Sequence, residues 1–152
     1  MTNVIIIYES KYGNTKRVAE TIMEGMSEKG IEAVLSDIKE VDPNKLSNFD
    51  GILLGSPNHI GGPTRSVEKC IDSLGKLGLK GKPIAVFDTY MGKDFEKAVK
   101  KMEKQITEKA HDMRLLTPRL SIRVQGMKGP IPQEELAKCQ EFGKEIAGKI
   151  TA

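Results

Sequence analysis

The sequence contains no tryptophan and few other aromatic residues, which make up 5% of the chain. Its charge is also nearly balanced, because it has 24 Lys and Arg residues and 21 Asp and Glu residues, which gives a net charge of +3. Nucleic-acid binders usually combine a strong basic excess with aromatic side chains that stack on bases. We therefore expect no nucleic-acid partner.

Long hydrophobic runs and cysteine pairs are scarce as well. No apolar stretch has the length that crosses a membrane, and the run at residues 4–7 lacks the basic flank and cleavage site of a signal peptide. Cys70 and Cys139 each recur at helical spacing with apolar residues, which predicts core thiols. No His, Asp or Glu cluster has the spacing of a metal site. We expect a cytoplasmic protein with no membrane association and no metal.

A length of 152 residues suits one domain, spanning residues 1–152. Apolar patterns predict strands near residues 3–8, 31–35, 50–55, 83–88 and 113–124, and helices near residues 14–28, 64–75, 93–109 and 132–150. Thr117-Pro118 interrupts the fifth strand, and the connection at residues 36–48 allows only a short helical stretch. This alternation predicts an α/β fold, a doubly wound parallel sheet of five strands with helices on both faces.

The most informative segment lies where the first strand passes into the first helix. It consists of Ser10, Lys11, Tyr12, Gly13, Asn14 and Thr15. A helix N-terminus offers unpaired backbone N–H groups and a positive dipole end, the hydroxyl groups add donors, and Gly13 permits close approach of an anion. The segment is either a phosphate-binding loop or an ordinary turn capped by hydroxyl groups.

Two further loops follow the third and fourth strands, at the same edge of the predicted sheet. Residues 55–64 form a long connection rich in Gly and Pro, with many backbone groups that suit the edge of a flat heterocycle. Residues 88–92 carry Tyr90, which is placed to lie against a planar ligand. Because ligands of open α/β sheets bind at the carboxyl ends of strands, we expect the three loops to share one site.

Taken together in this order, the three loops resemble the flavodoxin family, and specifically its short-chain form. The segment Gly55-Ser56-Pro57-Asn58-His59-Ile60-Gly61-Gly62 is similar to the isoalloxazine loop of flavodiiron proteins and flavodoxin-like quinone reductases. The resemblance implies the strand order 2-1-3-4-5 and FMN as the cofactor. It implies that residues 58–62 address the N5 and pyrimidine edge of the ring and that Tyr90 covers its outer face. The cofactor-binding residues it implies are Ser10, Lys11, Tyr12, Gly13, Asn14, Thr15, Ser56, Pro57, Asn58, His59, Ile60, Gly61, Gly62, Asp88, Thr89, Tyr90, Met91 and Gly92, with no catalytic residue.

The chain departs from the family pattern at several positions. Without a tryptophan, the inner face of the ring is left to His59, to Ile60 or to no side chain. Asp88 stands where glycine is common, and we expect it to cap its own short loop through an Asx turn. The chain is mildly basic, whereas the family is typically acidic. Lys93, Lys97, Lys100, Lys101 and Lys104 crowd the predicted third helix, which indicates either a solvated surface or a docking face for an acidic redox partner.

The resemblance implies an FMN-dependent electron carrier that moves electrons between partner proteins, and we expect a monomer or weak dimer. The alternative is an NAD(P)H-dependent quinone or flavin reductase on the same fold, although such enzymes usually carry extra segments for which this chain has little room. A third alternative is a flavodoxin-like module without cofactor, against which the phosphate loop argues. A nicotinamide-binding Rossmann domain would need three glycines in the first loop, which has one.

Overall fold

The computed structural model describes residues 2–152 and confirms the predicted architecture. All strand pairs of the sheet are parallel, in the order β2-β1-β3-β4-β5, and β6 also pairs with β4. The strands are β1 (Asn3–Tyr8), β2 (Glu32–Asp37), β3 (Gly51–Pro57), β4 (Pro83–Tyr90), β5 (Arg114–Leu115) and β6 (Leu120–Arg123). The helices are α1 (Asn14–Glu28), α2 (Arg65–Lys76), α3 (Lys97–Lys109) and α4 (Gln133–Thr151), with two short 3₁₀ helices, η1 (Ile38–Glu40) and η2 (Pro43–Asn48).

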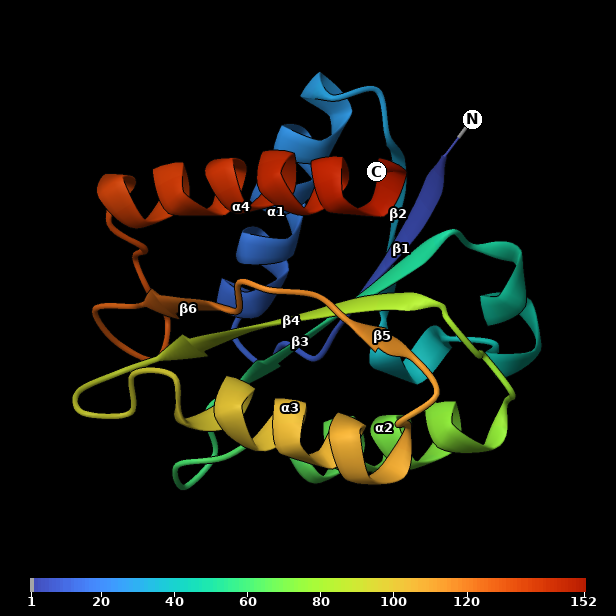
Figure 1. The fold of residues 1–152 in the computed structure, drawn as a ribbon. Helices are drawn as coiled ribbons and strands as arrows, with labels where there is room; N and C mark the ends of the chain where they lie inside the picture. Colours follow the sequence, from blue (N-terminus) through green and yellow to red (C-terminus); the bar gives the residue numbers. More distant parts are fainter. Residues whose placement is uncertain (1) are drawn as a thin grey trace.

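Helices cover both faces of the sheet, α1 and α4 on one and α2 and α3 on the other (Figure 1). Successive side chains of a strand point to opposite faces, so in β1 Ile6 packs under α1 and α4 while Ile5 and Ile7 pack under α2 and α3. Both faces are apolar because both are covered. Cys139 is buried in the core between the sheet and helices α1 and α4. Cys70 is half buried and packs against the core between the sheet and helices α2 and α3, so both cysteines are core thiols, as predicted.

The interrupted fifth strand is confirmed and has a simple geometric form. β5 pairs with the beginning of β4 at Pro83 and Ile84, whereas β6 pairs with its end, from Phe87 to Tyr90. The two segments therefore occupy one position in the sheet, separated by the Thr117-Pro118 connection. Pro118 has no N–H to donate to a strand ladder. The split brings β6, and the loop that follows it, to the carboxyl edge of the sheet.

The predicted start of the third helix was wrong by four residues, because α3 begins at Lys97 and not at residue 93. Residues 91–96 form turns that end at Glu96, whose φ of 60° lies in the left-handed region and cannot continue a helix. Lys93 consequently lies in the loop before α3. Within the described residues, no helix has the length and apolar character needed to cross a membrane.

Candidate functional site

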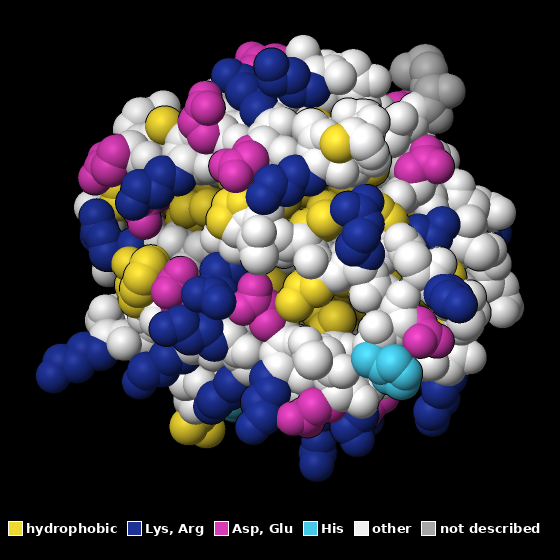
Figure 2. Space-filling model, viewed as in Figure 1, with side chains coloured by type: hydrophobic (Ala, Val, Ile, Leu, Met, Phe, Trp, Pro, Cys, Tyr) yellow, Lys and Arg dark blue, Asp and Glu magenta, His cyan; other side chains and the backbone are white. Residues whose placement is uncertain are grey.

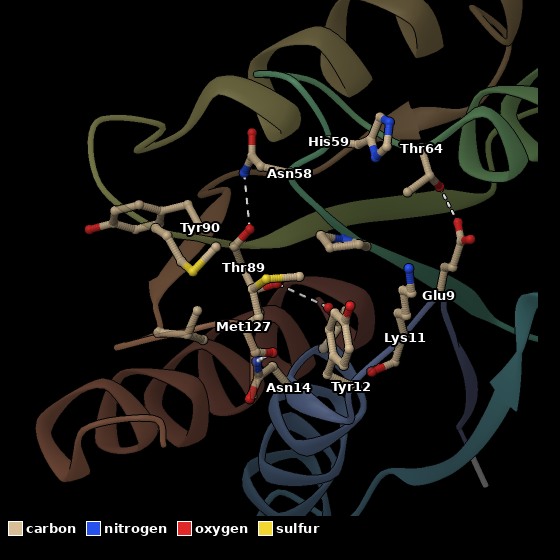
Figure 3. A pocket seen from close by; sticks show the side chains of 15 residues that line it. Glu9, Lys11, Tyr12, Asn14, Asn58, His59, Thr64, Thr89, Tyr90 and Met127 are labelled. Carbon is tan, nitrogen blue, oxygen red and sulfur yellow. Dashed lines mark hydrogen bonds between the residues drawn. The ribbon is translucent and has the colours of Figure 1, made fainter. Parts of the chain in front are cut away.

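The three predicted loops meet at the carboxyl edge of the sheet and enclose a cavity of about 390 Å³ (Figure 3). The loops leave the ends of β1, β3 and β4, and a fourth segment, after β6, adds another wall. The cavity is lined by Glu9, Ser10, Lys11, Tyr12, Asn14, Thr15, Pro57, Asn58, His59, Thr64, Thr89, Tyr90, Met91, Val124 and Met127. Its volume lies in the range of small-molecule and cofactor sites.

The first loop ends at the N-terminus of α1, as the sequence predicts. Gly13 has a φ of 96°, a left-handed conformation that glycine adopts without strain, and its N–H donates to the Oγ of Ser10 at 3.0 Å. The first N–H group of α1 to donate to the backbone is that of Arg17, which bonds to the Gly13 carbonyl oxygen at 2.9 Å. The N–H groups of Asn14, Thr15 and Lys16 precede it and have no acceptor within the helix, and the N-cap residue supplies no side-chain cap. No atom lies within 4 Å of the place where a Cβ of Gly13 would be, which leaves this side of the loop open.

Two side chains of the first turn of α1 bind other walls of the cavity. The hydroxyl groups of Thr15 and Thr89, both buried, are 3.0 Å apart and share a hydrogen bond. Asn14 Nδ2 donates to the carbonyl oxygen of Met127 at 2.8 Å. Residues from the end of β4 and from the loop after β6 are thus fixed to the same helical turn.

The second loop is anchored at both ends. Asn58 donates to the Thr89 carbonyl oxygen from its backbone N and from Nδ2, each at 3.0 Å. Ser56 is fully buried beneath the loop, where its Oγ donates to the Pro57 carbonyl oxygen at 2.7 Å and accepts the N–H of Thr64 at 3.1 Å. Ser56 therefore shapes the loop from below and does not line the cavity.

Between these anchors, residues 59–62 form a tight turn that projects outward. The N–H of His59 donates to the carbonyl oxygen of Gly62 at 2.7 Å, and Ile60 and Gly61 have φ values of 52° and 69°. Left-handed φ at both central positions is typical of a type I′ turn, in which a β-branched residue is strained. Ile60 is 92% exposed and lies outside the cavity, whereas His59 lines it.

Thr64 joins the second loop to the end of β1. Its hydroxyl group donates to the carboxylate of Glu9 and accepts the N–H of Val67 at 3.3 Å, so Thr64 also caps α2. The Glu9 carboxylate lines the cavity but already has this donor (Figure 3). The lysine of the first loop, Lys11, is exposed, and its Nζ lies 5.4 Å from the centre of the Tyr12 ring.

Asp88 does not form the predicted turn in its own loop, and that prediction was wrong. It is a fully buried residue of β4 that caps α3 from across the fold: one carboxylate oxygen accepts the N–H of Val99 at 3.1 Å, and the other accepts the Ser121 hydroxyl at 2.5 Å. Ser121 Oγ in turn accepts the N–H of Glu96 at 2.9 Å. Burial raises the pKa of Asp88 to about 6, against the effect of these hydrogen bonds.

Aromatic and thioether side chains form the apolar walls. The Tyr90 ring lines the cavity and meets Phe95 edge to face, with ring centres 5.4 Å apart. Figure 3 shows Tyr90 and Tyr12 on either side of Thr89, with Met127 between them and Asn14 below. The cavity therefore has flat apolar walls and, at the start of α1, a group of N–H and hydroxyl donors.

Most of the predicted binding residues are brought together. Eleven of them line the cavity: Ser10, Lys11, Tyr12, Asn14, Thr15, Pro57, Asn58, His59, Thr89, Tyr90 and Met91. The others lie beside it or beneath it, namely Gly13, Ser56, Ile60, Gly61, Gly62, Asp88 and Gly92. Sequence reasoning missed Glu9, Thr64, Val124 and Met127. The segment rich in Gly and Pro that follows β6, Gly126-Met127-Lys128-Gly129-Pro130, was the available signal for Met127.

Similarity to known proteins shows the family to which this chain belongs. A model of the flavodoxin domain family matches residues 5–127. A flavodoxin of Clostridium saccharobutylicum is 36% identical over 87 residues, covering 57% of this chain and 54% of that protein. An NAD(P)H dehydrogenase (quinone) of Geobacter sulfurreducens is 32% identical over 104 residues, covering 52% of this chain and 51% of that protein.

The solved structure of a flavodoxin from the domain Archaea superposes with a TM-score of 0.86 and 26% identity, covering 99% of this chain and 100% of that chain. The chain spans about half the length of the two sequence relatives. Since the family model covers most of the sequence, the chain belongs to the flavodoxin family.

Proposed function

We propose that the protein binds FMN in this cavity and carries electrons between redox partner proteins. The observation that carries the proposal is the cavity itself, in which a helix N-terminus with hydroxyl donors lies at one part of the lining and flat apolar walls at another. FMN combines a phosphate with a planar ring system, so the donors match its phosphate and the apolar walls match its ring.

Within this proposal, the first turn of α1 holds the phosphate. The N–H groups that begin at Asn14 and the hydroxyl groups of Ser10 and Thr15 supply donors, and the positive end of the helix dipole favours an anion. The apolar walls formed by Tyr90 and Met127 shield the ring, and Asn58 and His59 border its other side. The bound flavin supplies the redox chemistry, whereas the protein supplies orientation and electrostatics.

The first test is FMN affinity, measured by titrating apoprotein and following the quenching of flavin fluorescence. Thr15→Ala and Ser10→Ala should each weaken binding by about tenfold, the effect of one lost hydrogen bond to a charged group. Lys11→Ala should have a smaller effect, because the Lys11 side chain is exposed. A chain that binds no FMN at micromolar concentration, or Lys11→Ala as the weakest binder of the three, would contradict the proposed site.

The second test separates a carrier from a reductase, the function that the name of the Geobacter relative suggests. A carrier should take up electrons one at a time during stepwise photoreduction and should react negligibly with NADH or NADPH. A long-wavelength absorption band midway through photoreduction is the expected sign. Rapid bleaching of the flavin by NADH or NADPH, without that band, would assign the chain to the reductases and leave the FMN site intact.

A further inference from the structure

The mouth of the cavity is surrounded by most of the exposed large apolar side chains of the described residues. Six such side chains are exposed, and five of them lie here: Tyr12 (41%), Ile60 (92%), Met91 (42%), Phe95 (55%) and Met127 (55%). Tyr12, Met91 and Met127 line the cavity, Ile60 follows His59, and Phe95 contacts Tyr90. We refer to these five as the apolar rim. Apolar side chains gathered at one place on a surface mark an interaction site.

Lysines lie on and beside this rim. A Cβ on Gly61 would lie 3.5 Å from Lys97 Cδ, and one on Gly62 would lie 3.3 Å from Lys101 Nζ, so both side chains rest on the turn that carries Ile60. Lys and Arg side chains gather over α3 and around the loop before it (Figure 2). We refer to Lys11, Lys93, Lys97, Lys101 and Lys128 as the basic rim; all five are exposed.

Two acidic residues near the rim are paired with cations. Asp94 lies 3.3 Å from Lys97, and Glu96 pairs with Lys100 and with Arg119 at 3.7 and 3.6 Å. Glu9 accepts the hydroxyl group of Thr64, which is neutral, so one carboxylate is set against the lysines of the rim. Within residues 2–152, Lys11, Lys93, Lys101 and Lys128 have no carboxylate at ion-pairing distance. The rim therefore presents an excess of positive charge to a partner.

We propose that the apolar rim and the basic rim together form a docking surface for a redox protein whose own docking face is acidic. The inference rests on the proposed function, because a carrier must bring its flavin close to the redox centre that receives or donates the electron. Complementary charge would steer the encounter, and the apolar rim would exclude water from the contact. An anionic membrane and a second copy of the chain are the other occupants that such a surface could take.

Small redox probes test the sign of the surface charge directly. FMN-loaded, photoreduced protein is mixed with ferricyanide, a trianion, or hexaammineruthenium(III), a trication; each takes one electron from the flavin. Between about 10 and 500 mM ionic strength, oxidation by ferricyanide should slow and oxidation by hexaammineruthenium should accelerate. Lys97→Gln with Lys101→Gln should slow the ferricyanide reaction about three- to tenfold at low salt.

The matched control is Lys29→Gln with Lys80→Gln, which makes the same charge change at exposed positions near the amino ends of the strands. This variant should keep the wild-type rates. Equal effects of the two double variants would overturn the proposal. So would the reverse salt dependence, in which oxidation by ferricyanide accelerates and oxidation by hexaammineruthenium slows as the ionic strength rises. Because all measurements use FMN-loaded protein, a failure of FMN binding is recognised separately and beforehand.

Protein binding tests the apolar rim, with an acidic [2Fe–2S] ferredoxin as the probe. Ile60→Ser should weaken the complex about threefold or more, whereas Val34→Ser, the matched change at the exposed side chain on β2, should not. Absence of a complex at low salt would overturn the proposal. So would lysine-dependent binding to phosphatidylserine vesicles without ferredoxin binding, which would assign a membrane, or a dimer that Ile60→Ser abolishes, which would assign a second copy.

Discussion

The buried carboxylate of Asp88 gives a prediction whose sign and size follow from the structure. Asp88 caps α3 by accepting hydrogen bonds from Val99 and Ser121, yet its burial raises its pKa from the ordinary 3.8 to about 6. A raised carboxyl pKa means that the folded state binds the proton more tightly than the unfolded state. The stability that the protonated group contributes is fully present below pH 4 and is lost as the pH rises through about 6.

The size follows from the same two values. Each unit of pKa corresponds to about 1.4 kcal/mol, so the interval between 3.8 and about 6 corresponds to about 3 kcal/mol. Asp88→Asn removes the titration but keeps the shape of the side chain. Its stability relative to the wild type should therefore rise by most of this amount, about 2 kcal/mol, between pH 4 and pH 7. At every pH the variant also loses about 1 kcal/mol of stability, because Val99 and Ser121 donate to different carboxylate oxygens and an amide has only one oxygen.

The assay is urea unfolding of Asp88→Asn and of the wild type at several pH values between 4 and 7.5, at one FMN concentration. The difference between their free energies of unfolding is compared across pH, because other titrating groups contribute equally to both proteins and cancel. Asp72→Asn, on the exposed side of α2, provides the control for removing a carboxylate outside the core. A difference between Asp88→Asn and wild type that stays constant with pH would refute the reasoning. A difference of the opposite slope would show that hydrogen bonding outweighs burial at this carboxylate.

Three further predictions test the packing of the fold and the walls of the cavity. Gly143→Ala in α4 should destabilise the protein by about 2 kcal/mol or more, because the added Cβ would lie 2.2 Å from the Ile22 carbonyl oxygen of α1. Gly148→Ala in the same helix should stabilise the protein by about 1 kcal/mol, because no atom lies within 4 Å of its added Cβ. Thermal unfolding measures both variants, and equal effects would contradict the close contact between α4 and α1. Tyr90→Ala should weaken FMN binding by about 1 to 3 kcal/mol, the range for aromatic stacking on a base, and unchanged affinity with unchanged fluorescence quenching would place the ring elsewhere. Asn14→Ala should release the loop that contains Met127 and weaken FMN binding by about 1 kcal/mol, because it removes the hydrogen bond to the Met127 carbonyl oxygen. Amide hydrogen exchange in residues 125–131 should become faster in this variant. Unaltered exchange would show that Asn14 does not fix this loop.

Much of the fold and about three quarters of the cavity lining could be predicted, because the relevant signals are local. Buried apolar runs, the glycine before α1 and the proline that divides β5 from β6 each restrict the chain within a few residues. The rule that ligands bind at the carboxyl ends of parallel strands then placed three loops in one site. Met127 was missed because its approach to Asn14 joins residues 113 apart in the sequence.

The sequence by itself determined the order of strands and helices, the apolar character of both faces of the sheet and the glycine turn at the start of α1, since each depends on side chains close together in the chain. Only the tertiary structure decided where α3 begins and what Asp88 does. The partners of Asp88, Val99 and Ser121, lie 11 and 33 residues away and meet it through the packing of α3 and β6 against β4. The arrangement of Ile60, Phe95 and Met127 around one cavity has the same origin, because no local pattern specifies which distant loops the sheet brings to a common edge.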